Sequence, residues 1–183
     1  MAYQIEQDRI RAILPDGFVS LRPVLRINAE ILDGQTAYLE FNTPVEFEGK
    51  RGWLNIDNWN GDILTFERNE KSVTFSAPFL RITFTPVGIA GGCPAEKDND
   101  GCYFPGHGLR PPESICANKE FCNCEFAWNF SNGDAHGVSI GKTLPAYPEE
   151  PKIQYKKQAF TAPNAAALPC KQVLGSYVVI FDR

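Results

Sequence analysis

The stretch VLRINAEILDGQTAYLEFN, residues 24–42, decides the fold class of this chain. Every second residue is apolar from Leu25 to Ile31, and the alternation returns from Ala37 to Phe41. A period of two predicts β strands that bury one face. Asp33-Gly34, which separates the two runs, is typical of a two-residue hairpin turn. The stretch therefore predicts an antiparallel β hairpin.

The rest of the chain continues with short strands and tight turns. Ile10, Ile13 and Leu14 recur at helical spacing before a turn sequence, which predicts one short N-terminal helix. Pro44 is expected to begin a new strand, and residues 49–52 (Gly-Lys-Arg-Gly) are expected to form a turn. Further strands are predicted at residues 53–56, 63–68, 73–77 and 80–84, and residues 177–181, apolar on both faces, predict a central buried strand.

Length and composition indicate a single globular domain spanning residues 1–183. The chain has 183 residues, of which 43% are hydrophobic and 22% are charged, the ordinary usage of a folded domain. The many strands and little helix predict a mostly β protein, an antiparallel barrel-like fold or sandwich. Residues 91–141, rich in Gly and Cys, are expected to form an insertion.

Charge and hydropathy exclude several classes of partner. The net charge is −4, and basic residues form no stripe interleaved with aromatics, which argues against a nucleic-acid partner. No apolar run approaches the length of about 18 residues that a membrane-spanning helix needs. The polar start of the chain carries no secretory signal, so a cytoplasmic location is expected. The sequence leaves the oligomeric state open, with a homo-oligomer among the options.

Three stretches together resemble the acetoacetate decarboxylase-like superfamily. They are DRIRAILP followed by VLRI (residues 8–15 and 24–27), YLE, PVEF and GKRG (38–40, 44–47 and 49–52), and AP, LP and VLGSY (162–163, 168–169 and 173–177). They cover about half of the chain, in the order found in the family. The resemblance implies a barrel-like β fold around a small-molecule cavity and chemistry on a small carbonyl or keto-acid compound.

The same resemblance implies a catalytic acid at Glu40. Decarboxylating relatives also carry a Schiff-base lysine in a Pro-Lys step, and the corresponding interval, residues 62–78, has no such step. Its one lysine is Lys71, beside Glu67 and Glu70, which would raise the pKa of an amine that must be neutral to attack a carbonyl. Lys71 is thus a nominal catalytic candidate, and an exposed turn residue is the plainer interpretation.

Glu40 shares one side of its predicted strand with Tyr38 and Asn42. If these side chains face a cavity, burial would raise the pKa of the Glu40 carboxyl and suit it to general acid–base work, with Tyr38 and Asn42 binding substrate. If they face outward, Glu40 is an ordinary surface acid. No cofactor and no metal site are expected for this chemistry.

The six cysteines, Cys93, Cys102, Cys116, Cys122, Cys124 and Cys170, leave three alternatives open. Disulfides would suit a secreted protein, zinc would suit the cytosol, and free thiols need neither. The knuckle spacing C-x-x-C is missing, which weakens the zinc alternative.

The leading interpretation is a diverged acetoacetate decarboxylase-like enzyme, of the lyase or isomerase/cyclase type, that uses acid–base chemistry at Glu40. One alternative is a non-catalytic β barrel that binds a small molecule, either a carbonyl compound or an apolar ligand held among the 13 Phe residues. A second is a secreted interaction domain stapled by disulfides.

Overall fold

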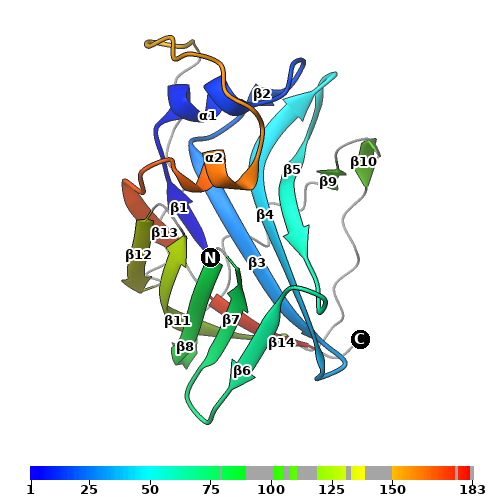
Figure 1. The fold of residues 1–183 in the computed structure, drawn as a ribbon, viewed down its shortest axis with the longest axis vertical. Coiled ribbons are helices and arrows are strands. Elements are labelled where there is room, and N and C mark those ends of the chain that lie inside the picture. The colour runs from blue at the N-terminus through cyan, green and yellow to red at the C-terminus, as the bar shows by residue number, and fades with distance from the viewer. Residues whose placement is uncertain are drawn as a thin grey trace.

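The computed structural model is built almost entirely of β strands in two sheets (Figure 1). It describes residues 1–78, 80–89, 101–104, 108–110, 119–130, 133–138, 150–175 and 177–181. The mostly β fold class predicted from the sequence is confirmed. Within those ranges neither sheet closes on itself, so the arrangement is a two-sheet sandwich and not a closed barrel.

The first sheet has eight strands. Its neighbours are antiparallel except for β5 and β9, which run parallel. In order across the sheet the strands are β10 (Gly108–Arg110), β9 (Gly101–Phe104), β5 (Lys50–Trp59), β4 (Thr36–Phe47), β3 (Val24–Leu32), β1 (Ala2–Gln4) and β13 (Gln172–Gly175), and β2 (Val19–Ser20) pairs with β4.

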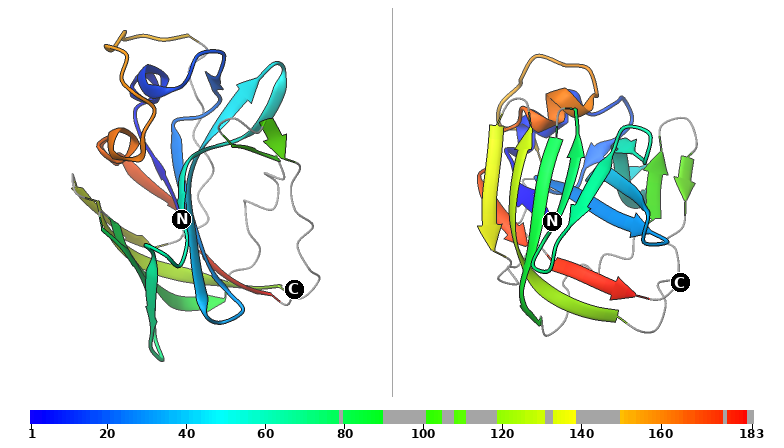
Figure 2. Two further views of the ribbon diagram at one scale, coloured as in Figure 1. Left: turned by 45° about the vertical axis from the view of Figure 1, so that its right-hand side comes forward. Right: turned by 60° about the horizontal axis from the view of Figure 1, so that its bottom comes forward.

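The second sheet has six strands, and β11 pairs with three of them. Figure 2 shows it as a second layer packed against the first sheet. Its order is β12 (Gly133–Val138), β11 (Lys119–Phe130), β8 (Leu80–Ile89), β7 (Val73–Ala77) and β6 (Thr65–Arg68), with β14 (Tyr177–Phe181) beside β11. The described part of the Gly- and Cys-rich zone thus supplies strands to both sheets.

Two short helices lie together at one end of the molecule (Figure 1). The predicted helix is confirmed as α1 (Gln7–Ile13), which buries Ile10 and Ile13. The second helix, α2 (Ala162–Ala166), begins after Thr161, whose hydroxyl accepts a hydrogen bond from the backbone N–H of Asn164 at 3.3 Å. That contact satisfies one of the free N–H groups at the helix start. Within the described ranges, no helix is both long enough and apolar enough to span a membrane.

The first hairpin forms where the sequence predicts it. Asp33 and Gly34 both have positive φ, 50° and 67°, and Leu32 pairs with Thr36, so the connection is the three residues 33–35 and not two. The second turn is displaced from its predicted place at residues 49–52. Glu48 and Gly49 make it, with φ of 51° and 75°, and β5 begins at Lys50. A glutamate in a left-handed conformation is uncommon, so residue type alone does not predict a turn at this position.

The prediction that Pro44 begins a strand is wrong, because β4 runs unbroken through it. The last β3–β4 pair is Arg26 with Asn42, so the missing N–H of Pro44 falls beyond the end of that ladder. The carbonyl of Pro44 still accepts a hydrogen bond from the backbone N–H of Leu21 at 3.1 Å. Proline is tolerated in a strand at such an edge.

The prediction that residues 177–181 form a central strand is also wrong. Among the described strands, β14 pairs with β11 alone. An apolar run predicts that both faces of a strand are covered, but it does not fix how many strands flank it.

The main core lies between the two sheets. Leu39 and Phe41 from β4 pack in one cluster with Phe75 and Phe84 from the second sheet. The rings of Phe75 and Phe84 meet edge to face at 6.1 Å between centroids, a favoured aromatic geometry. These large rings fill the interior and hold the two sheets together.

Candidate functional site

The eight-stranded sheet carries a set of polar side chains on the face turned away from the main core. Ala37, Leu39 and Phe41 belong to the core, and Tyr38, Glu40 and Asn42 alternate with them along β4. Side chains alternate between the faces of a strand, so these three share the opposite face, here called the outer face. Tyr38 and Glu40 are half-buried and Asn42 is fully buried.

The Glu40 carboxylate is held by two side-chain donors. Asn28 of β3, directly opposite Glu40 in the ladder, donates from Nδ2 to Oε1 at 2.7 Å. The hydroxyl of Tyr38 donates to Oε2 at 3.2 Å. Both oxygens are therefore oriented, and each keeps a lone pair to accept a proton. The structure places Tyr38 beside Glu40 on the face turned away from the core, and not in a cavity between the sheets, and it adds Asn28.

A ladder of asparagines continues the polar surface across β4 and β5. Asn58 donates from Nδ2 to Oδ1 of Asn55 at 3.1 Å, and Asn55 donates from Nδ2 to Oδ1 of Asn42 at 3.2 Å. Asn58 pairs with Glu40 and Asn55 pairs with Asn42 in the β4–β5 register. The ladder fixes the side chain of Asn42, with its oxygen already engaged.

A β-bulge in β5 determines which residues reach the outer face. Phe41 pairs with Asp57 and the next residue, Asn42, pairs with Asn55, so Ile56 is an extra residue in β5. A bulge reverses the face on which the following side chains lie. If β5 alternated regularly through Ile56, Leu54 would point outward; because the bulge absorbs Ile56, Asn55 and Trp53 point outward instead.

Trp53 is enclosed on the outer face by cations and apolar side chains. It is 3% exposed and packs with Val24 and Leu174 in a small second cluster. The guanidinium carbon of Arg26 lies 3.6 Å from the centre of the Trp53 ring, and that of Arg22 lies at 5.6 Å. Both distances are within the range of cation–π attraction.

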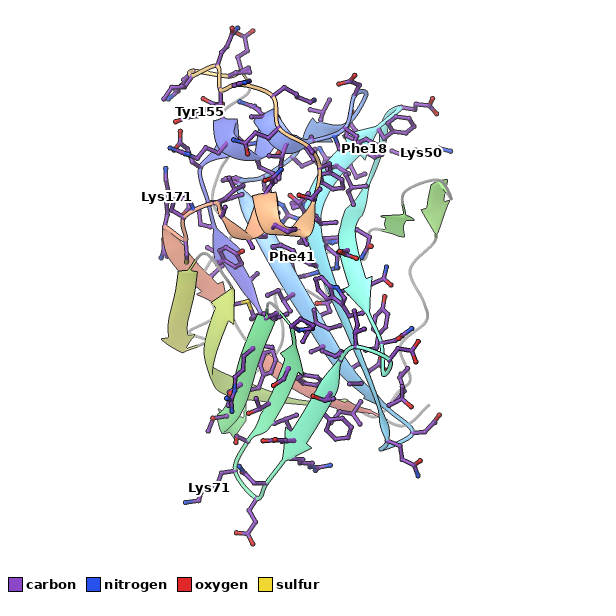
Figure 3. The ribbon with its side chains drawn as sticks, viewed as in Figure 1. Phe18, Phe41, Lys50, Lys71, Tyr155 and Lys171 are labelled. Carbon is purple, nitrogen blue, oxygen red and sulfur yellow. The ribbon has the colours of Figure 1, made fainter. Side chains whose placement is uncertain are left out.

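Lys71 lies away from this group of side chains. It is an exposed residue in the turn between β6 and β7, in the second sheet. Figure 3 places it at the end of the molecule opposite Tyr155. There it lines a shallow surface depression with Asn69, Glu70, Ser72 and Thr85. The structure therefore does not bring Lys71 to Glu40.

The cysteine alternatives fall mostly outside the described residues. Cys93 and Cys116 are not described, and only the backbone is described at Cys102, Cys122 and Cys124. Cys170 is an exposed free thiol, and partial burial of its sulfur raises its pKa above the ordinary value. The described residues contain no group of three or more His, Cys, Asp or Glu that could hold a metal ion.

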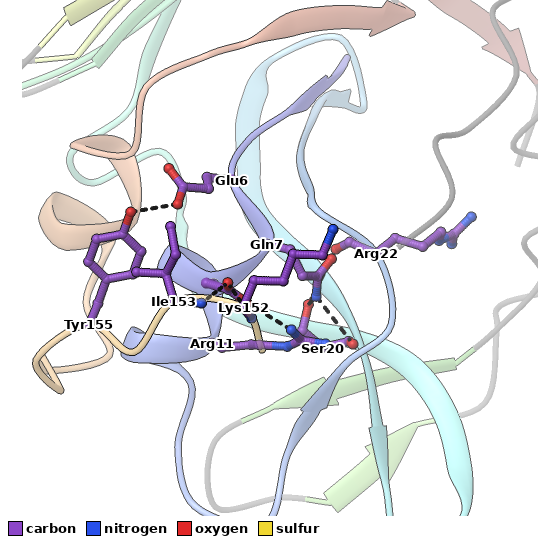
Figure 4. Close-up of polar contacts among 9 residues, drawn as sticks. Glu6, Gln7, Arg11, Ser20, Arg22, Lys152, Ile153 and Tyr155 are labelled. Carbon is purple, nitrogen blue, oxygen red and sulfur yellow. Dashed lines mark hydrogen bonds and ion pairs between the residues drawn. The ribbon is translucent and has the colours of Figure 1, made fainter. Parts of the chain in front are cut away.

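A second polar cluster, around Asp8 of α1, fastens the segment that follows residue 150 (Figure 4). Asp8 is 7% exposed. Its Oδ2 accepts the backbone N–H groups of Lys152 at 2.9 Å and Ile153 at 2.7 Å, and its Oδ1 accepts from Arg11 at 2.8 Å. Burial acts to raise the pKa of Asp8, but these three donors together outweigh it and lower the pKa.

Glu6 and Tyr155 make a neighbouring contact of the same kind. The Tyr155 hydroxyl donates to Glu6 at 2.6 Å, and Arg9 forms an ion pair with the other oxygen of Glu6 at 3.1 Å. The hydrogen bond from Tyr155 is the main cause that lowers the pKa of Glu6, and it raises the pKa of Tyr155. Since both carboxylates are engaged by the protein itself, this cluster is structural.

We expect the stability of the protein to fall in acid because of these two carboxylates. A lowered pKa in the folded state means that the unfolded chain takes up protons first, so stability is lost as the pH falls below the ordinary values of 4.5 for Glu6 and 3.8 for Asp8. Urea unfolding at pH 7, 5, 4 and 3 should show a loss that begins below about pH 5. In Asp8→Asn the free energy of unfolding should be lower at pH 7 and should change less as the pH falls. An equal slope in the two proteins would contradict the role of Asp8.

The chain has a structural likeness among solved proteins. No family model matches the chain. No curated protein matches it. The structure is similar to acetoacetate decarboxylase from Legionella pneumophila subsp. pneumophila str. Philadelphia 1, with a TM-score of 0.49 and 14% sequence identity, over 96% of this chain and 76% of that one. A likeness of this size carries no conclusion about function.

Sequence reasoning missed four outer-face residues: Arg26, Asn28, Trp53 and Asn55. The alternation in residues 24–32 already placed Arg26 and Asn28 opposite the apolar face, on the same side as the polar residues of the next strand once the hairpin is drawn. Trp53 and Asn55 carried no such signal, since their orientation depends on the bulge.

Proposed function

We propose that this chain binds a small carbonyl compound, keto acids included, against the outer face and that Glu40 exchanges a proton with it. The observation that supports this proposal is the orientation of the Glu40 carboxylate by Asn28 and Tyr38, on a face that the core does not use. A base held at both oxygens by neighbouring donors is positioned for proton transfer.

The reaction that fits these residues is enolisation. Glu40 removes a proton from the carbon next to the carbonyl group, the C–H bond breaks, and its electron pair forms the enolate. The carboxylic acid then returns the proton to the same or another atom of the enolate. The positive charge of Arg26, on the same face, favours the developing negative charge. This chemistry needs no lysine, in keeping with the place of Lys71.

The test is exchange of substrate protons for deuterium in D2O, followed by proton NMR with acetone, 2-oxobutanoate and 4-oxopentanoate. The protein should accelerate exchange at the carbon next to the carbonyl group of at least one compound. Glu40→Gln should lower that rate about 100-fold, because general-base catalysis contributes roughly 10²–10⁴-fold.

Glu46→Gln is the matched control, since Glu46 lies on the same face of the same strand but pairs with Arg51 at 3.9 Å. It should exchange at the parent rate. Thermal unfolding of both variants shows that they are folded. Exchange no faster than in buffer, or equal rates in Glu40→Gln and the parent, would reject the proposal.

A further inference from the structure

Two buried N–H donors on the outer face have no acceptor among the residues that the structure describes. Asn42 is 0% exposed and Trp53 is 3% exposed. Neither Nδ2 of Asn42 nor Nε1 of Trp53 has a hydrogen-bond partner within the part of the chain that the structure describes. Buried polar atoms without partners are rare and costly in native proteins, so each calls for an explanation.

The two donors belong to one place in the sheet. Asn42 pairs with Asn55 across β4 and β5, and Trp53 pairs with Pro44, two residues farther along β4. Same-face residues at this diagonal offset lie within reach of each other. Arg26 pairs with Asn42 on the other side, and its guanidinium carbon lies 3.6 Å from the Trp53 ring centre.

The unpartnered atoms of Asn42 and Trp53 in the described part of the chain are both hydrogen-bond donors. The indole offers a donor and no acceptor, and the oxygen of Asn42 is already engaged by Asn55. Arg26 adds a permanent positive charge. A group of donors beside a cation matches an anionic ligand with several acceptor oxygens, and a carboxylate is the smallest planar group of that kind.

We infer that Arg26, Asn42 and Trp53 form a binding site for the carboxylate of a small keto acid. The inference rests on the proposed function, because it places the carboxylate of the same substrate whose carbonyl end meets Glu40. Asn42 lies two residues from Glu40 along β4, a separation of about 7 Å. A keto acid of about five or six carbons whose carbonyl group is remote from the carboxylate, such as 4-oxopentanoate, approaches that length, with its anionic end held away from the Glu40 carboxylate.

The test compares a keto acid with its neutral ester. Protein labelled with ¹⁵N is titrated with 4-oxopentanoate and with methyl 4-oxopentanoate. The chain has three Trp residues, so its indole N–H signals are few and assignable by substitution. The Trp53 indole signal should shift saturably with the acid, and the ester should bind at least tenfold more weakly, because it lacks the charge.

The decisive variant is Trp53→Phe, which keeps an aromatic ring beside Arg26 and removes the N–H together with the second ring of the indole. It should bind the acid about tenfold more weakly, the loss expected for one hydrogen bond to a charged group. Trp59→Phe is the matched control, because Trp59 lies on the same strand but packs in the main core. It should bind the acid as the parent does. Equal affinities for acid and ester, or an unchanged affinity in Trp53→Phe, would overturn the inference.

The outcome can be separated from that of the proposed function. Glu40→Gln should lose proton exchange yet bind the acid within about threefold of the parent, since its neutral amide still accepts the bond from Asn28. Exchange that depends on Glu40, without selective binding of the acid at Trp53, would overturn this inference alone. Selective binding at Trp53 without exchange would reject the acid–base role and support the carboxylate site.

Discussion

A Phe41→Ala variant should have a free energy of unfolding about 4 kcal/mol lower than the parent, the range found for emptying a large buried ring site. Phe41 is 0% exposed and packs in the core between the two sheets. It lies in the middle of β4, opposite the bulge in β5 (Figure 3). The neighbouring strands cannot collapse into the space without giving up their ladder, so most of the cavity should persist.

Urea unfolding followed by circular dichroism measures this loss as a lower midpoint at unchanged slope. Phe66→Ala is the control, because Phe66 is only partly buried against the same core. Phe66→Ala should lower the free energy of unfolding by less than half as much as Phe41→Ala. A loss below about 1.5 kcal/mol for Phe41→Ala would show that the centre of the sheet relaxes around the gap, contrary to this expectation.

Asp8→Ala is the second variant with a large expected effect, about 3 kcal/mol, as for other buried charged groups with several hydrogen bonds. The substitution removes the acceptor of the Lys152 and Ile153 N–H groups and removes the ion pair between Asp8 and Arg11. The segment after residue 150 then loses its main polar contact with α1.

The control for Asp8 is Asp16→Ala. Asp16 is a fully exposed acid whose contact with Lys157 spans 3.2 Å, and exposed ion pairs contribute little. Its free energy of unfolding, measured in urea, should fall by less than about 0.5 kcal/mol. Equal losses in free energy of unfolding for Asp8→Ala and Asp16→Ala would show that the buried contacts of Asp8 do not stabilise the fold more than an exposed ion pair does.

The two polar clusters differ in how completely their groups are paired. Around Asp8, both carboxylate oxygens meet protein donors, so the cluster needs nothing from outside. Around Asn42 and Trp53, buried donors lack acceptors in the described part of the chain. In the carboxylate site that we propose, a ligand would supply the acceptors for these donors.

Alternation and turn chemistry made β3, β4 and the first hairpin predictable from the sequence. The core positions Leu25, Ile27, Leu39 and Phe41 follow from period two alone. Two local boundaries were missed, at Pro44 and at the Glu48 turn, because each depends on what the neighbouring strands do there. The strand neighbours of β14 were missed for the same reason, since pairing is a property of the whole sheet.

The candidate site was only half predictable. Tyr38, Glu40 and Asn42 emerged together because they share one strand, and a strand has only two faces. Trp53 looks like a core residue by its size, and its neighbours in sequence give no sign of a bulge. Its place beside Arg26 depends on the bulge in β5, and the residue type of Ile56 does not predict a bulge there.

The bulge at Ile56 also shows how β5 can tolerate a change in strand length. β5 has one residue more than the stretch of β4 that it faces, and the bulge absorbs that residue, so Trp53 and Asn55 still lie opposite Pro44 and Asn42. Deleting the codon for Ile56 would therefore leave a regular ladder with Trp53 and Asn55 on the outer face, and would remove only one apolar side chain from the main core. A chain can thus gain or lose a residue at this position without rearranging the polar groups on the outer face.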